Sequence, residues 1–112
     1  MKTALRRVAH VRSGDKGNTA TIGVIAYSDA LYVEVKRQLT AERVKAFYGA
    51  AVTGEVKRYA VDGIAALNFT ADGALGGGVS RSLSIDNYGK ALSAALLRLE
   101  LDIPDGLVDD LR

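Results

Sequence analysis

The spacing of hydrophobic residues switches along this chain between a period of two and a helical period, and this switching constrains the fold most. Residues 20–27 (ATIGVIAY) alternate, which places Ile22, Val24 and Ala26 on one face, as in a half-buried strand. Residues 31–39 then carry leucine and valine at helical spacing, although the stretch LYVEV is also good strand material. Such a chain needs both a sheet and helices.

The same patterns extend over the whole sequence and give the order β-β-α-α-β-β-(β)-α. The expected strands are 3–11, 20–27, 55–61 and 64–70, with a short edge strand at 81–85. The expected helices follow Ser28, Thr40 and either Asp86 or Asn87, each of which can cap a helix N-terminus. Pro104 ends the ordered pattern, so an acidic tail is expected from about residue 100.

Glycine and aspartate mark where these elements connect. Residues 12–18 (RSGDKGN) form a loop between the first two strands, which then make a hairpin. Asp62-Gly63 is the dipeptide best suited to a tight type I′ turn between the next two strands. Gly49 ends the second helix, whose predicted apolar face comprises Val44, Phe47 and Tyr48.

Each predicted helix carries an apolar stripe on one side only. The economical way to bury such stripes is an antiparallel sheet covered on one face by helices, which is an α+β two-layer sandwich. A length of 112 residues suits a single domain, 1–112, with one core. The 48% hydrophobic and 25% charged content is ordinary for a globular protein.

Composition argues against several functional classes. The chain has no cysteine and one histidine, so thiolate zinc sites and histidine clusters are excluded, and no metal or cofactor is expected. No apolar run is long enough to span a membrane and no export signal is evident, so the sequence predicts a cytoplasmic protein without membrane contact. A net charge of +2 with scattered tyrosines does not indicate nucleic-acid binding.

Charge is distributed unevenly along the chain. Residues 1–18 carry five basic side chains and one acidic one, whereas residues 100–112 carry five acidic side chains and one basic one. These segments could pair within the fold or between subunits of a homo-oligomer. A solvated surface is the simpler interpretation, because exposed ion pairs stabilise little.

The first glycine-rich segment, residues 12–18, has the composition of an anion-binding site. Glycines 14 and 17 allow positive φ and could turn backbone N–H groups toward one point, with a guanidinium and an ammonium at the rim. The candidate ligand-binding residues here are Arg12, Ser13, Gly14, Asp15, Lys16, Gly17 and Asn18. A plain turn remains the alternative, since Asp15 opposes an anion and Asn18 is a common turn former.

A second glycine-rich segment, GALGGGVSRS at residues 73–82, raises the same question. It matches neither the Walker phosphate loop nor the dinucleotide fingerprint. The candidate ligand-binding residues are Gly76, Gly77, Gly78, Ser80 and Arg81. Asn68 lies within the apolar strand ALNF, where a buried amide needs a partner and could brace one of the loops.

Catalysis has only weak candidates. His10 is expected at the strand end that leads into the first loop, where its pKa range would suit a general base. Asp15 could fold back toward His10 or act as a base itself. No partner for His10 is fixed by spacing.

Four segments together resemble a known family. They are HVRSGDKGNTATIGVIA (10–26), LTAERVKAF (39–47), ALNF (66–69) and GALGGGVSRSLSIDNYGKAL (73–92). Over residues 3–99 they resemble the small ferredoxin-like domain of the acyclic terpene utilisation AtuA family. The resemblance implies a ferredoxin-like fold, a larger AtuA-type chain as partner, and a setting in the catabolism of acids as coenzyme A thioesters. It implies no catalytic residues.

Three functions therefore remain open. The first is an accessory module that binds a small anionic ligand, such as a carboxylate, a phosphate or acyl-CoA, through the two glycine-rich segments. The second is a structural or oligomerisation domain with those segments at a subunit interface. The third is a small acyl-thioester enzyme with His10 or Asp15 as base.

Overall fold

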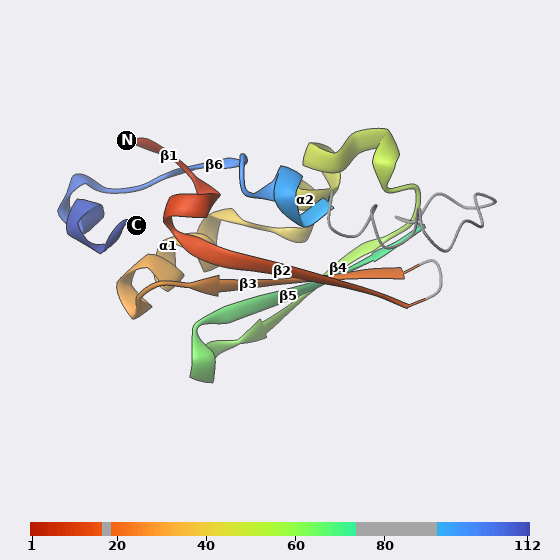
Figure 1. The fold of residues 1–112 in the computed structure, drawn as a ribbon, viewed down its shortest axis with the longest axis horizontal. Helices are drawn as coiled ribbons and strands as arrows, with labels where there is room; N and C mark the ends of the chain where they lie inside the picture. Colours follow the sequence, from red (N-terminus) through yellow and green to blue (C-terminus); the bar gives the residue numbers. More distant parts are fainter. Residues whose placement is uncertain (17–18, 74–91) are drawn as a thin grey trace.

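The computed structural model describes residues 1–16, 19–73 and 92–112, excepting the side chains of residues 15 and 16, and its main element is a four-stranded antiparallel sheet (Figure 1). The strands, in spatial order, are β2 (Ala9–Lys16), β3 (Thr19–Ala26), β5 (Ala66–Asp72) and β4 (Val56–Val61). A second sheet pairs β1 (Lys2–Ala4) with β6 (Glu100–Asp102). The described helices are α1 (Asp29–Gln38), α2 (Ala41–Tyr48) and residues 92–96. The short 3-10 helices are η1 (Leu5–Arg7), η2 (Gly49–Ala51), η3 (Asp62–Ile64) and η4 (Asp105–Asp110).

The core lies between the four-stranded sheet and the helices that cover one of its faces (Figure 1). Ile22 and Val24 of β3 and Phe69 of β5 are fully buried on this inner face, and Leu31 and Val35 of α1 pack against them. The period of two in β3 and the helical period in α1 each bury one side, because water is excluded only between the layers. The α+β fold with an antiparallel sheet is confirmed.

Two of the three predicted helix starts, Ser28 and Thr40, are confirmed by their caps. The Ser28 hydroxyl accepts from the backbone N–H of Leu31 at 3.1 Å, and the Thr40 hydroxyl accepts from Arg43 at 3.1 Å. Gly49 follows α2 with φ 56°, as a C-terminal stop requires. The predicted apolar face of α2 is wrong in one position, since Phe47 is 39% exposed.

The predicted first strand, residues 3–11, is interrupted. Leu5–Arg7 forms η1, and the chain re-enters a sheet only at Ala9. The backbone N–H of Leu5 donates to the carbonyl of Leu99 at 2.8 Å, and that of Arg6 donates to Leu97 at 3.0 Å. These bonds to the C-terminal part of the chain bend the N-terminal segment away from the four-stranded sheet.

The connection between β4 and β5 is also longer than the predicted two-residue turn. Residues 62–64 form η3, and Ala65 follows with φ 53°, a left-handed conformation that is uncommon for alanine. The hydroxyl of Tyr32 donates to Asp62 Oδ1 at 2.5 Å. Asp62 is thereby held against α1 rather than at the tip of a tight hairpin.

The C-terminal segment is not the tail that the sequence suggests. Residues 100–102 pair with β1, Ile103 is fully buried, and η4 follows Pro104. The ammonium group of Met1 lies 3.5 Å from an Asp102 carboxylate oxygen. The oppositely charged segments therefore meet within the fold, chiefly through strand pairing. No helix among residues 1–16, 19–73 and 92–112 is long and apolar enough to cross a membrane.

Candidate functional site

The described residues that flank the two glycine-rich segments lie next to one another. Thr19 begins β3 and pairs with Asp72 at the end of β5, and the Thr19 hydroxyl donates to Asp72 Oδ1 at 3.0 Å. Lys16, on the other side of the β2–β3 connection, pairs with Thr19. Both segments therefore leave the same end of the four-stranded sheet.

The first described residues after the second segment, Leu92 and Ser93, also lie beside β2. Leu92 is buried, and Ser93 in the following turn of helix accepts a hydrogen bond from the Ser13 hydroxyl at 3.2 Å. Ser13 thus lies on the inner face, under the helices. It ties β2 to the residues that follow the second segment and is not free at a loop tip.

Gly73 fixes the exit of the chain from β5. Its φ is 70°, and a Cβ there would lie 2.3 Å from the Thr53 hydroxyl oxygen. The backbone N–H of Gly54 donates to the Asp72 carbonyl at 2.9 Å, which holds the same end of β5. Only glycine suits position 73, because both the backbone angle and the space exclude a side chain.

The expectation of a loop over residues 12–18 is wrong for most of its length. Residues 12–16 continue β2 in register with β3, and Gly14 pairs with Thr21. Gly14 is not among the described glycines with positive φ, and a Cβ there would meet the Thr21 hydroxyl at 2.9 Å. Glycine at position 14 leaves room for the side chain of Thr21 on β3. A backbone anion nest at Gly14 is therefore not supported.

Arg12 and Asn68 lie on the face of the sheet turned away from the helices, which we call the outer face. One row across this face contains Arg12, Gly23, Asn68 and Tyr59. A Cβ on Gly23 would meet nothing within 4 Å, so the space between Arg12 and Asn68 is open. The expectation that Asn68 is buried is wrong, because β5 turns it outward while Leu67 and Phe69 fill the core.

His10 lies at the opposite end of β2 from the glycine-rich connection, so its predicted position is wrong. Its ring packs edge-on against Tyr27, with centroids 4.9 Å apart. Asp15 is five residues further along an extended strand, or about 16 Å away, so the two cannot form an acid–base pair. No observation in the described part of the chain favours the enzyme alternative.

The remaining candidate residues lie outside the described residues. These are Gly17, Asn18, Gly76, Gly77, Gly78, Ser80 and Arg81, together with the side chains of Asp15 and Lys16. The predicted edge strand at 81–85 and the capping residues Asp86 and Asn87 lie there too.

A polar cluster that the sequence did not reveal joins α1 to η3. Asp62 receives hydrogen bonds from the Tyr32 hydroxyl and from Lys36 Nζ, the latter at 2.9 and 3.1 Å. Burial and the neighbouring Asp62 raise the pKa of Tyr32 to about 12. The same hydrogen bonds lower the pKa of Asp62. The cluster is a helix–sheet tie, because its polar groups satisfy one another.

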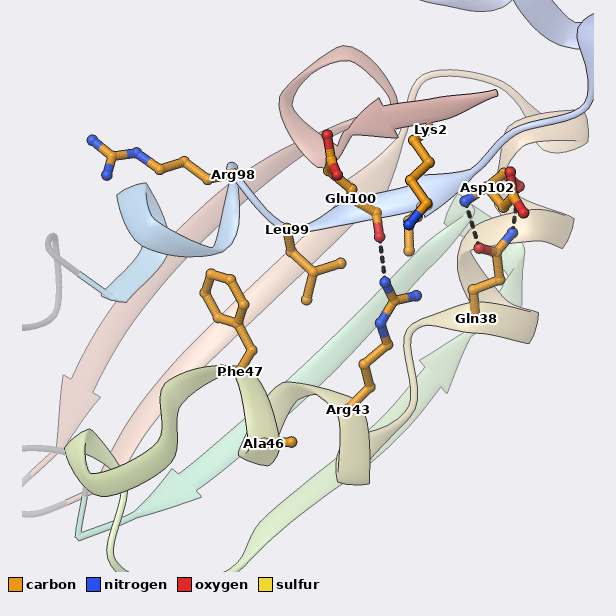
Figure 2. Close-up of a pocket in the computed structure, with 10 residues that line it drawn as sticks. Lys2, Gln38, Arg43, Ala46, Phe47, Arg98, Leu99, Glu100 and Asp102 are labelled. Carbon is orange, nitrogen blue, oxygen red and sulfur yellow. Dashed lines mark hydrogen bonds between the residues drawn. The ribbon is translucent and has the colours of Figure 1, made fainter.

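A hollow of about 750 Å³ between α2 and β6 was also missed (Figure 2). The Arg43 guanidinium donates to the Glu100 carbonyl, and the Gln38 amide exchanges two hydrogen bonds of 2.7 Å with the backbone of Asp102. Only the adjacency of β6 to α2 assembles these residues, so no sequence motif could have indicated them. No group of three or more His, Asp or Glu side chains in the described ranges could hold a metal ion.

The fold defines the class of protein. A four-stranded antiparallel sheet with the described helices packed on one face, together with the two-stranded sheet of β1 and β6, is an α+β fold. The chain belongs to the AtuA ferredoxin-like domain family, whose model matches residues 3–102. Searches of curated proteins and of solved structures gave no match.

Proposed function

We propose that the chain is an accessory module that binds a small anionic ligand at the end of its sheet, where the β2–β3 connection lies beside the start of the second glycine-rich segment. The single observation that supports this is the pairing of Thr19 with Asp72, which brings the flanks of both segments together. The segments supply glycines, serines and Arg81, which suit a carboxylate or phosphate group.

Arg12 and Asn68 can contact the proposed ligand only if that ligand is long. Arg12 is four residues, or about 13 Å, along β2 from Lys16, and it lies on the outer face. A simple anion at the sheet end would not reach it. A coenzyme A thioester could extend over the open row between Arg12 and Asn68. The acyl-CoA setting and the larger AtuA-type partner rest on the family resemblance alone.

Isothermal titration with phosphate, acetate, coenzyme A and acetyl-CoA tests the proposal. We expect Arg81→Ala to weaken every ligand that binds by about tenfold or more, since a charge-assisted hydrogen bond contributes about 1.5–3 kcal/mol. Arg12→Ala should weaken only the coenzyme A ligands. Arg37→Ala, which changes an exposed cation on α1, is the charge-matched control. Absence of heat with all four ligands would contradict the proposal.

A subunit interface is the second candidate function. It is favoured by the outer face, on which no described helix lies, and by the adjoining η3, where Tyr59, Val61 and Ile64 are 50%, 42% and 63% exposed. Exposed apolar side chains that cluster on one face often mark contacts with another protein.

A further inference from the structure

The hollow between α2 and β6 lies apart from the sheet end discussed above and is built from different elements. Its lining residues are Lys2, Gln38, Arg43, Ala46, Phe47, Arg98, Leu99, Glu100, Leu101 and Asp102. Its volume of about 750 Å³ is within the range of small-molecule sites and far larger than an inorganic ion needs.

One half of the hollow is cationic. Figure 2 shows the Lys2 side chain extending toward the Arg43 guanidinium across the space between β1 and α2. Arg43 uses Nη2 to donate to the Glu100 carbonyl, which fixes the guanidinium and leaves its other N–H groups available. Within the described part of the chain, neither Lys2 nor Arg43 forms an ion pair with a carboxylate.

The two acidic residues of the rim form no ion pair with Lys2 or Arg43 among the described residues, although Asp102 is the cross-strand neighbour of Lys2. The Asp102 carboxylate lies 3.5 Å from the Met1 ammonium group, which partly compensates its charge. Figure 2 shows the Glu100 carboxylate directed away from Arg43, and Glu100 meets Arg43 only through its main-chain oxygen. The space between Lys2 and Arg43 is therefore suited to an external anion.

The other half of the hollow is apolar. Phe47 follows Arg43 by four residues, so both project from the same side of α2, about 6 Å apart at Cβ. The Phe47 ring is 39% exposed beside Leu99, and Ala46 extends the same surface (Figure 2). An exposed phenyl ring next to an unpaired guanidinium matches a ligand with a charged head and a short hydrocarbon body.

We propose that this hollow binds a small aliphatic carboxylate. The carboxylate lies between Lys2 and Arg43, and the hydrocarbon lies over Phe47 and Leu99. Arg43 presents a guanidinium already oriented by the Glu100 carbonyl, so little side-chain freedom is lost on binding. Both halves contribute to the proposed site. Neither Lys2 nor Arg43 forms an ion pair among the described residues, and the Phe47 ring is 39% exposed.

An NMR titration of the ¹⁵N-labelled full chain with hexanoate, acetate and hexanol tests this proposal. Acetate keeps the charge without the tail, and hexanol keeps the tail without the charge. We expect hexanoate to bind at least tenfold more tightly than either, with the largest amide shifts at residues 43–47 and 98–102. Equal affinity for the three compounds, or shifts confined to residues 12–19 and 72–73, would overturn it.

Variants separate the two halves of the hollow. Lys2→Gln and Phe47→Ser change exposed side chains, so folding should be retained, and each should weaken hexanoate by about tenfold. Lys2→Gln should also weaken acetate but not hexanol, whereas Phe47→Ser should also weaken hexanol but not acetate. Lys57→Gln, an exposed cation on β4, should have no effect. Full hexanoate affinity in both test variants would refute the site even if the wild-type chain binds hexanoate elsewhere.

Discussion

Three long side chains hold this molecule together by placing a polar tip on the main chain of another element. The Tyr48 hydroxyl donates to the Leu92 carbonyl at 2.6 Å, and Arg58 Nη1 donates to the last carbonyls of α1, at Lys36 and Leu39. The Tyr32 hydroxyl, which donates to Asp62, also lies 3.1 Å from the Ala66 carbonyl oxygen. In the part of the chain that is described, no buried polar side-chain atom lacks a partner. Such bonds cost stability when one partner is removed.

The Tyr32 hydroxyl should make the free energy of unfolding depend on alkaline pH. Its pKa is about 12 in the folded chain and about 10 when unfolded, so the folded state holds this proton more tightly. The contribution is complete below pH 10 and is lost as pH rises toward 12. Urea denaturation at pH 8, 10 and 11 should show a smaller alkaline loss for Tyr32→Phe than for wild type. The variant should be about 1 kcal/mol less stable at pH 8. Identical pH profiles would contradict this role.

Alanine substitutions at Gly73 and Gly63 form a matched pair. Gly73→Ala introduces a Cβ at φ 70° and 2.3 Å from the Thr53 hydroxyl, so we expect a loss of about 1–3 kcal/mol. Gly63→Ala, where a Cβ would meet nothing within 4 Å, should change stability by about 0.5 kcal/mol or less. Chemical denaturation of both variants measures the difference. Equal stabilities would show that the β5 exit is not constrained as described.

Among the elements, the edge of the two-stranded sheet at β6 is capped by side chains of α1 and α2. The outward main-chain groups of β6 would be a free edge, which proteins normally protect. Gln38 bonds both the N–H and the carbonyl of Asp102 at 2.7 Å, and Arg43 bonds the carbonyl of Glu100. Side chains of α1 and α2 thus take the place of a third strand.

Gln38→Ala should open this edge. We expect a loss of about 1–2 kcal/mol and faster hydrogen exchange at the Asp102 amide, because two hydrogen bonds to the main chain disappear. Arg37→Ala removes the ion pair with Glu34 on the same helix, in which the Arg37 side chain is 65% and the Glu34 side chain 15% exposed. It keeps Gln38 and its two bonds to Asp102, so we expect the exchange rate of the Asp102 amide to stay unchanged. An unchanged exchange rate at Asp102 would contradict the capping of β6.

The elements differ in how far local sequence determines them. The period of two in β3 and the caps Ser28 and Thr40 predict their elements correctly, because the same few residues carry both the signal and the structure. The continuation of β2 through Gly14 was not predictable, since pairing with β3 overrides the turn propensity of glycine. Strand β6 was missed because its partner β1 is about a hundred residues distant in sequence.

The features of the candidate site also differ in how far local sequence determines them. The glycine-rich segments were visible in the sequence, and the register of β3 with β5 adds that their flanks meet. The outward position of Asn68 and the distance between His10 and the sheet end follow from strand direction, which composition does not encode. The hollow between α2 and β6 depends on tertiary contacts alone.

In the whole molecule, the helices cover one face of the sheet, and no described helix lies on the outer face (Figure 1). Arg12 and Lys57 give this outer face a basic character, which opposes pairing with a second copy of itself. We expect light scattering to report a monomer of 11.8 kDa. A doubled mass that Ile64→Glu reduces to a monomer would instead favour the subunit-interface function.

Our main proposal is that the sheet end where Lys16 and Thr19 lie beside Asp72 and Gly73 is one half of an anion site completed by the second glycine-rich segment. A crystal structure of the chain grown with acetyl-CoA tests this claim most directly. We expect ligand density beside Thr19 and Gly73, with contacts from Gly76–Gly78 or Arg81. Glycine-rich segments that lie far apart, with ligand density elsewhere or none at all, would contradict it.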